Sequence, residues 1–155
     1  MSATVDTNIL LYAANADDES HQVARDLLER LAAGPDLLYL FWPTIMGFLR
    51  ISTHPAIFTD PHTPKQAADA ITGLLQRPNV RAPGEQDGFW DIYDATADDQ
   101  TRGNHVPDAY LAALMRQHGV SIIYTRDRDL RRYETIDARN PFALGHAPSQ
   151  VEQSS

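Results

Sequence analysis

The chain has 155 residues, of which 43% are hydrophobic and 22% charged, as expected for one globular domain with a single core. It contains no cysteine, which excludes disulfides, thiolate catalysis and cysteine-based zinc sites. The net charge of −8 argues against a protein that binds nucleic acid through basic residues alone. A nuclease with this negative charge would need a divalent metal ion to bind the phosphate of its substrate.

The chain shows no sign of a membrane segment. No apolar run approaches the roughly 18 residues that span a bilayer, and residues 1–6 have no basic segment of the kind that begins a signal peptide. We therefore expect a cytoplasmic protein without a membrane partner.

Short apolar runs alternate with longer amphipathic ones, which predicts an α/β fold with a mostly parallel central sheet flanked by helices. Residues 3–5 are expected to form a strand that ends at Asp6, and residues 8–14 a helix. A second helix, capped by Asp17 or Asp18 and ended by Gly34-Pro35, is indicated by apolar residues at helical spacing: Val23, Leu27, Leu28 and Leu31.

The middle of the chain continues this alternation. Residues 37–41 are expected to form a buried strand, and Pro43 begins a helix that ends before His54-Pro55. Thr63-Pro64 supplies a cap and a first-turn proline for a helix through about Gln76. A short strand at 79–82 and a helix around residues 89–93 follow.

The last predicted elements include a second strand that is followed directly by an acidic residue. Pro107 is expected at the first position of a helix through His118, with Gly119 just beyond it. Residues 120–125 form the strand that the pattern indicates best, followed by one or two helical turns over 126–133 and an edge strand at 135–136. We expect one domain over residues 1–144 and a polar, disordered tail over 145–155.

Two acids follow predicted strands directly, and a third begins a helix. Asp6 follows the first strand, Asp127 follows the strand at 120–125, and Asp108 lies in the first turn of the helix before it. Ligands of open parallel sheets bind beyond the carboxyl ends of the strands. Three carboxylates gathered there would repel one another unless a cation lay between them, and oxygen ligands favour magnesium or manganese.

Each acid also has a simpler interpretation. Asp6 caps the helix that follows, Asp108 is an acid at a helix N-terminus, and Asp127 is a turn residue. Taken alone, the spacing supports an acidic crevice in an α/β domain and nothing more specific.

Four stretches, in this order, resemble the PIN-domain ribonuclease toxins of VapC-type (type II) toxin–antitoxin modules. They are Val-Asp-Thr-Asn-Ile-Leu-Leu-Tyr-Ala at 5–13, Phe-Leu-Arg-Ile-Ser-Thr-His-Pro at 48–55, Pro-Asp-Ala-Tyr-Leu-Ala-Ala-Leu at 107–114 and Thr-Arg-Asp-Arg-Asp-Leu at 125–130. The resemblance extends over about residues 3–142 and is weakest between residues 58 and 104.

The resemblance implies a three-layer fold, a magnesium or manganese site, and RNA cleavage in the cytoplasm. It also implies silencing by a small antitoxin with a basic segment, and oligomers built on toxin dimers. Asp6, Asp108 and Asp127 match the family's first, third and fourth acids, which are catalytic and bind the metal. Asp129 matches a further acid beside the site, and Asn8 and Thr125 match polar residues that hold carboxylates or water in place.

Several arginines are candidates for holding the RNA backbone, because guanidinium groups bind phosphate through paired hydrogen bonds. The simpler interpretation of each is a solvated surface charge. The candidates are Arg50, Arg126 and Arg128, with Arg81 and Arg102 as further possibilities.

The family's second acid is missing, because Gly47 stands at its position. Glycine within a helix costs about 1 kcal/mol relative to alanine, so local preference does not explain it. One interpretation is close helix packing. The other is a lost ligand, natural or introduced, which predicts weaker metal binding and slower cleavage with the fold and antitoxin binding kept.

Other classes fit the residues less well. A haloacid dehalogenase-type phosphatase would need an acid where Asn8 stands and a late lysine, whereas Lys65 is the only lysine. An inactive PIN fold that serves as an antitoxin-binding or regulatory partner is the third hypothesis, and Gly47 favours it. The six histidines show no metal-binding pair at helical spacing, and five aromatic residues are expected in the core or an interface: Phe41, Trp42, Phe48, Phe89 and Trp90.

Overall fold

The computed structural model describes residues 1–144, and the tail predicted over 145–155 lies outside the described residues. Within that range the fold is α/β, as predicted, and its five strands are all parallel in the order β3-β2-β1-β4-β5. The strands are β1 Ala3–Val5, β2 Leu38–Tyr39, β3 Val80–Arg81, β4 Ile122–Tyr124 and β5 Asp137–Arg139.

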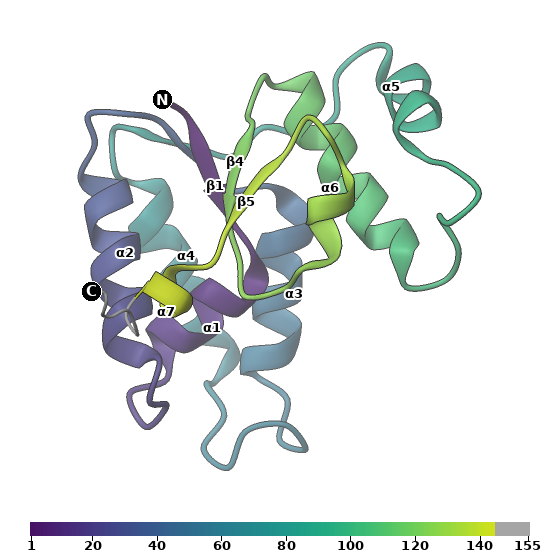
Figure 1. The fold of residues 1–155 in the computed structure, drawn as a ribbon. Helices are drawn as coiled ribbons and strands as arrows, with labels where there is room; N and C mark the ends of the chain where they lie inside the picture. The colour runs from purple at the N-terminus through teal and green to yellow at the C-terminus, as the bar shows by residue number, and fades with distance from the viewer. Residues whose placement is uncertain (145–155) are drawn as a thin grey trace.

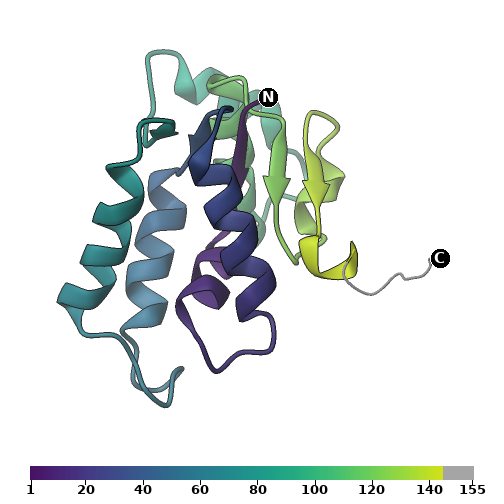
Figure 2. The same ribbon diagram turned by 90° about the vertical axis from the view of Figure 1, so that its left-hand side faces the viewer.

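Helices cover both faces of the sheet (Figures 1 and 2). One face carries α1 Thr7–Ala14, α2 His21–Ala33, α3 Trp42–Ser52 and α4 Pro64–Leu75, and the other α5 Phe89–Thr96 and α6 His105–Gln117. A 3-10 helix, η1, spans Asp129–Arg132, and α7 spans Pro141–Leu144. None of the helices within residues 1–144 is long and apolar enough to cross a bilayer.

The sheet has one hydrophobic core on each of its two faces. Side chains alternate along a strand, so Val5 packs into the cluster beneath α1–α4 while Ile123 packs beneath α6. Phe41 and Phe48, two of the aromatic residues expected inside, are fully buried in these two clusters. Trp42 and Trp90, which were expected in the core or an interface, are 38% and 70% exposed and so lie outside the core.

The strand order reverses beside β1, and in open parallel sheets such a switch point is where a crevice forms. The chain runs from β1 outward to β2 and β3, and then returns to add β4 on the other side of β1. Val5 of β1 pairs with Tyr124 of β4, and the amide of Asp6 donates to the Tyr124 carbonyl over 3.0 Å. The strands that precede Asp6 and Asp127 are therefore neighbours, at the point where an open parallel sheet binds ligands.

Local signals fixed most of the elements. Thr63 and Gln66 form a reciprocal capping box at the start of α4, as the Thr63-Pro64 pair suggested. Gly119 follows α6 with φ +69°, a left-handed conformation that suits glycine.

Four predictions need correction. Helix α2 has Ser20 at its N-cap instead of Asp17 or Asp18, because Oδ1 of Asp18 accepts the Ser20 amide before the helix begins. The helix predicted from Pro107 begins two residues earlier, at His105, because proline is tolerated anywhere in a first turn. The edge strand lies at 137–139 instead of 135–136, since Ile136 is drawn into the core beneath α6. Val23 is 39% exposed and Ala24 is buried in its place, because the buried face of α2 is rotated by one residue.

Candidate active site

A buried threonine joins the ends of the two central strands. Thr125 follows β4 and is only 1% exposed. Its Oγ1 donates a hydrogen bond to Oδ2 of Asp6 over 2.8 Å and accepts one from the amide of Asp127 over 3.0 Å. One hydroxyl therefore fixes both the first acid and the turn that carries the last one.

Asp6 has a hydrogen bond on each carboxylate oxygen. Its Oδ1 accepts the amide of Thr7 over 2.8 Å, so Asp6 caps α1 as its simpler interpretation required. Its Oδ2 is held by Thr125. The Asp6 carboxylate is thus oriented by one residue that follows β1 and by one that follows β4. Capping α1 therefore leaves the carboxylate at the crevice.

Asp108 reaches the same region from the first turn of α6. Its side chain is 28% exposed, and its pKa is raised, first by burial and then by the negative charges of Asp129 and Asp6. His105, whose Nδ1 lies 3.9 Å from Oδ2 of Asp108, opposes part of this shift. The shift shows that these carboxylates share one electrostatic environment.

Asp127 belongs to the same group. Burial raises its pKa most, followed by the charges of Asp6 and Asp129. Four carboxylates from β1, α6 and the segment after β4 therefore repel one another across one crevice. A cation bound among them would relieve that repulsion.

The donor set fits magnesium or manganese, which take oxygen ligands and keep bound water. Within residues 1–144 no three acidic or histidine side chains form a closed cage for an ion, so water would have to complete the coordination. Asn8, in the first turn of α1, adds a buried Oδ1 that has no hydrogen-bond partner. The structure thus offers several oxygen atoms at the crevice, and their roles as ligands remain predictions.

Gly47 lies where α3 crosses the start of α1. A β-carbon on residue 47 would stand 2.9 Å from Oγ1 of Thr7, which itself donates to the carbonyl of Thr44 over 3.2 Å. Close helix packing therefore gives a sufficient reason for glycine. The same contact places position 47 beside the residue that follows Asp6.

The candidate arginines differ in how many contacts their guanidinium groups make within the chain. Arg126 lies over the Phe142 ring at 4.1 Å and donates to Oγ of Ser20 over 2.8 Å, so it ties α1, α2 and α7 together. Arg81 and Arg102 donate to nearby backbone carbonyls. Arg50 and Arg128 are exposed and form no ion pair with another residue in the range 1–144.

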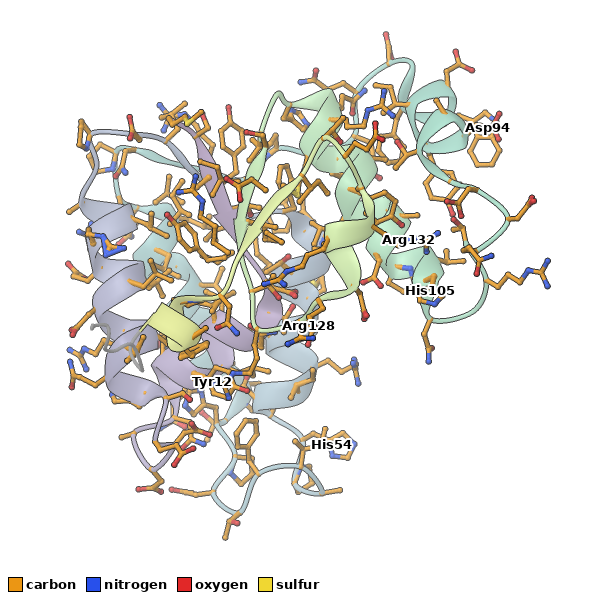
Figure 3. All side chains as sticks on the ribbon, viewed as in Figure 1. Tyr12, His54, Asp94, His105, Arg128 and Arg132 are labelled. Atoms are coloured by element: carbon orange, nitrogen blue, oxygen red, sulfur yellow. The ribbon has the colours of Figure 1, made fainter. Side chains whose placement is uncertain are left out.

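One side chain at the site was not anticipated from the sequence. His105 stands one turn before Asp108, and Figure 3 shows it on the same side of the molecule as Arg128 and Arg132. Its spacing of three residues from Asp108 was a usable signal. It was missed because the helix was expected to begin at Pro107.

Comparison with known proteins gives a family match over most of the chain. The model of the PIN domain family matches residues 3–136. The chain is 45% identical over 144 residues to Ribonuclease VapC48 of Mycobacterium tuberculosis, an alignment that covers 92% of this chain and 99% of the relative. It is 35% identical over 140 residues to Ribonuclease VapC43 of the same species, covering 88% and 93% respectively.

Two solved structures share the fold. VapBC2 from Rickettsia felis, bound to a promoter DNA fragment, superposes with a TM-score of 0.65 at 16% identity, over 90% of this chain and 98% of that one. VapC20 of M. tuberculosis, described as a sarcin–ricin loop cleaving toxin, gives a TM-score of 0.62 at 19% identity, over 86% and 98%.

The raised carboxyl pKa values predict how stability depends on pH. Because the pKa values of Asp108 and Asp127 are raised above the 3.8 of a free aspartate, these two groups favour folding most at low pH, where both are protonated. Without metal, their contribution to stability declines as the pH rises from about 3.8 through the raised folded pKa values.

At neutral pH without metal, Asp127→Asn should therefore raise the melting temperature only slightly, by about 1 °C, because solvent screens the repulsion at this exposed residue. Added Mg²⁺ should stabilise the wild-type chain more than this variant, because binding to the folded state alone raises stability. Thermal unfolding with EDTA and with MgCl₂ measures both effects. Asp87→Asn, at an exposed loop residue, is the matched control, and equal responses of the two variants would contradict the prediction.

Proposed function

This chain belongs to the PIN domain family, and from that premise we propose that it is the toxin of a type II toxin–antitoxin module, a metal-dependent ribonuclease that cleaves RNA phosphodiester bonds. The observation that carries the proposal is the set of carboxylates of Asp6, Asp108 and Asp127 at the carboxyl ends of β1 and β4. The relatives named as ribonucleases match it over almost their whole length.

The chain's own residues hold the acidic side chains in position. Thr125 and the amide of Thr7 hold Asp6 in one orientation, and Thr125 also fixes the backbone of Asp127. Magnesium or manganese, when bound, neutralises phosphate charge and lowers the pKa of bound water. An ionised carboxylate of this set accepts the proton of the attacking water. Asp129 adds negative charge that strengthens cation binding without touching the reacting atoms.

The RNA backbone is held by the exposed arginines. Arg50 lies one helical turn after Gly47, and Arg128 directly follows Asp127, so both stand beside the crevice. Guanidinium groups there would contact phosphates flanking the scissile bond. Arg126 is the weakest of the three candidates, because its guanidinium already binds Ser20 and Tyr12.

Replacing the first acid tests the enzyme directly. Asp6→Asn keeps one oxygen, which can accept either the Thr7 or the Thr125 hydrogen bond, and removes the charge. Mg²⁺-dependent cleavage of a susceptible RNA should therefore fall at least about 100-fold, the loss of nearly 3 kcal/mol of transition-state stabilisation. Single-turnover cleavage with and without EDTA measures this. Equal rates for the variant and the wild type would remove Asp6 from the chemistry.

We further propose that Gly47 weakens this activity by leaving the crevice one carboxylate short. The supporting observation is that position 47 packs against Thr7, the residue that follows Asp6. A glutamate there needs room, since its β-carbon would press on Thr7 Oγ1. Gly47→Glu alone therefore tests packing as much as chemistry, and the chain should lose stability.

The double variant Thr7→Ala/Gly47→Glu separates the two effects, because alanine at position 7 removes the atom in the way. It should cleave RNA about tenfold faster than Thr7→Ala/Gly47→Gln at limiting Mg²⁺, as one extra ligand charge worth about 1.4 kcal/mol would produce. The glutamine version is matched in size and lacks only the charge. Equal rates would mean that position 47 never needed an acid.

The second candidate function is a PIN-fold protein with little activity that acts mainly as an antitoxin-binding or regulatory partner. Gly47 is the observation that favours it. The same cleavage assay decides, since an absence of Mg²⁺-dependent cleavage in both the wild type and Asp6→Asn would support binding alone.

The partner we propose is a cognate antitoxin with a basic segment, in a homodimer or a larger toxin–antitoxin assembly. Solved neighbours of this fold include a VapBC complex and a toxin–antitoxin complex from Klebsiella pneumoniae. An arginine of that segment entering the crevice would compensate the repelling carboxylates.

Substituting that antitoxin arginine by alanine should weaken the complex at least about 30-fold, because a buried charge pair loses about 2 kcal/mol or more when one partner is removed. Isothermal titration of the purified toxin with each arginine variant gives the values. A structure of the complex without a basic residue near Asp6 or Asp108 would refute this part of the proposal.

A further inference from the structure

A second polar pocket lies at the other end of α1 from the acidic crevice. Helix α1 begins at the crevice and ends at Ala14, about 12 Å along the axis for its eight residues. Two loops meet below that end, residues 15–20 and residues 53–63, at the lower edge of Figures 1 and 2. They line a cleft of about 520 Å³. A smaller pocket of about 30 Å³, here called the inner cavity, adjoins the cleft and shares lining residues with it.

The inner cavity contains two buried polar atoms without a partner. Ser52, the last residue of α3, is 4% exposed, and neither its Oγ nor the buried Nδ1 of His62 has a hydrogen-bond partner within the described chain. The amide of His62 donates to the carbonyl of Ser52 over 2.8 Å, which closes the loop and brings the two residues together. Buried polar atoms are normally hydrogen-bonded. The Ser52 hydroxyl can accept a hydrogen bond, and so can Nδ1 of His62 when its ring proton is on Nε2, so this cavity suits a guest that donates hydrogen bonds.

The surroundings are negative. Asp17, Asp18 and Asp60 line the cleft, and no lysine or arginine is among the residues that line either part. Helices α1 and α3 both end here, and the carboxyl end of a helix carries partial negative charge. Carboxylates, helix ends and unpaired acceptors together select a cation.

The donor count selects an ammonium group. A divalent metal ion prefers several charged oxygen ligands, and Asp60 is the only acidic side chain that lines the inner cavity. A planar guanidinium needs partners for five donors in a fixed fork, whereas an ammonium has three donors. Ser52 Oγ, His62 Nδ1 and the carboxylate of Asp60 are three acceptors that line that cavity.

This chain cannot readily supply the ammonium itself. Its only lysine, Lys65, pairs with Asp69 over 3.1 Å on the exposed side of α4. Its N-terminal amine pairs with Asp36. The cation must come from another molecule, and Ile57, 54% exposed at the cleft, offers that molecule an apolar contact.

We propose that this cleft binds a lysine side chain of a partner protein, whose ammonium group reaches Ser52, His62 and Asp60 while its aliphatic stem packs on Phe58 and Leu11. The interaction is separate from the acidic crevice and leaves its carboxylates uncovered. It does not depend on the chain being a nuclease, because neither the cleft nor its guest includes a residue of the crevice.

The test uses the full-length, ¹⁵N-labelled chain and Nα-acetyl-lysine amide as the probe. Titration followed by NMR should produce saturable shifts of the amides of residues 14, 15, 52 and 62, with a Kd of millimolar order, typical of a single side chain worth about 4 kcal/mol. Nα-acetyl-norleucine amide, which has the stem without the charge, should leave these amides unmoved. Ser52→Ala and Asp60→Asn should each weaken lysine binding about tenfold, while Asp87→Asn should not.

Three results would overturn the proposal. Equal shifts with the norleucine probe would mean that the ammonium is not recognised, and an absence of saturable shifts would mean that the cavity holds water only. Methylammonium binding as tightly as the lysine amide would point to a free amine instead of a side chain. RNA cleavage by Asp60→Asn should equal the wild-type rate, which keeps this test independent of the proposed nuclease activity.

Discussion

The acidic crevice depends on one hydroxyl. Thr125 donates to Asp6 and accepts from the backbone of Asp127, so it couples the ends of two parallel strands that are 119 residues apart in the chain. Its burial keeps water from competing for these hydrogen bonds. Without this link, the carboxylates that follow β1 and β4 would be free to turn apart and reduce their repulsion.

That repulsion explains several features at once. Burial and neighbouring charges raise the pKa values of Asp108 and Asp127, so their ionised forms are disfavoured in the folded chain. The overall charge of −8 adds to a negative potential that attracts cations and basic groups. The metal ion and the basic antitoxin side chain that we propose would both reduce the same repulsion.

Helix α1 connects the two polar sites of the molecule. Its N-terminus is capped by Asp6 in the crevice, and its C-terminus faces the cleft around Ser52 and His62. Between them, Gly47 lets α3 approach Thr7 closely, so the packing of α3 fixes the helix that both sites share. A substitution at position 47 thus acts on geometry as well as on charge.

The sequence by itself determined the order and kind of the elements, and it singled out Asp6, Asp108 and Asp127. These are local properties, because caps, turn residues and apolar spacing act within a few residues of one another. Where the sequence misled, tertiary packing had overridden a local signal: Val23 turned outward and Ile136 entered the core.

Only the tertiary structure decided that β1 and β4 are neighbours, that Thr125 bridges them and that Gly47 touches Thr7. It also brought Ser52 and His62 together under α1. The physical reason is that such contacts join residues distant in the chain, and strand order and helix approach are set by how whole layers pack, which no short stretch of sequence encodes.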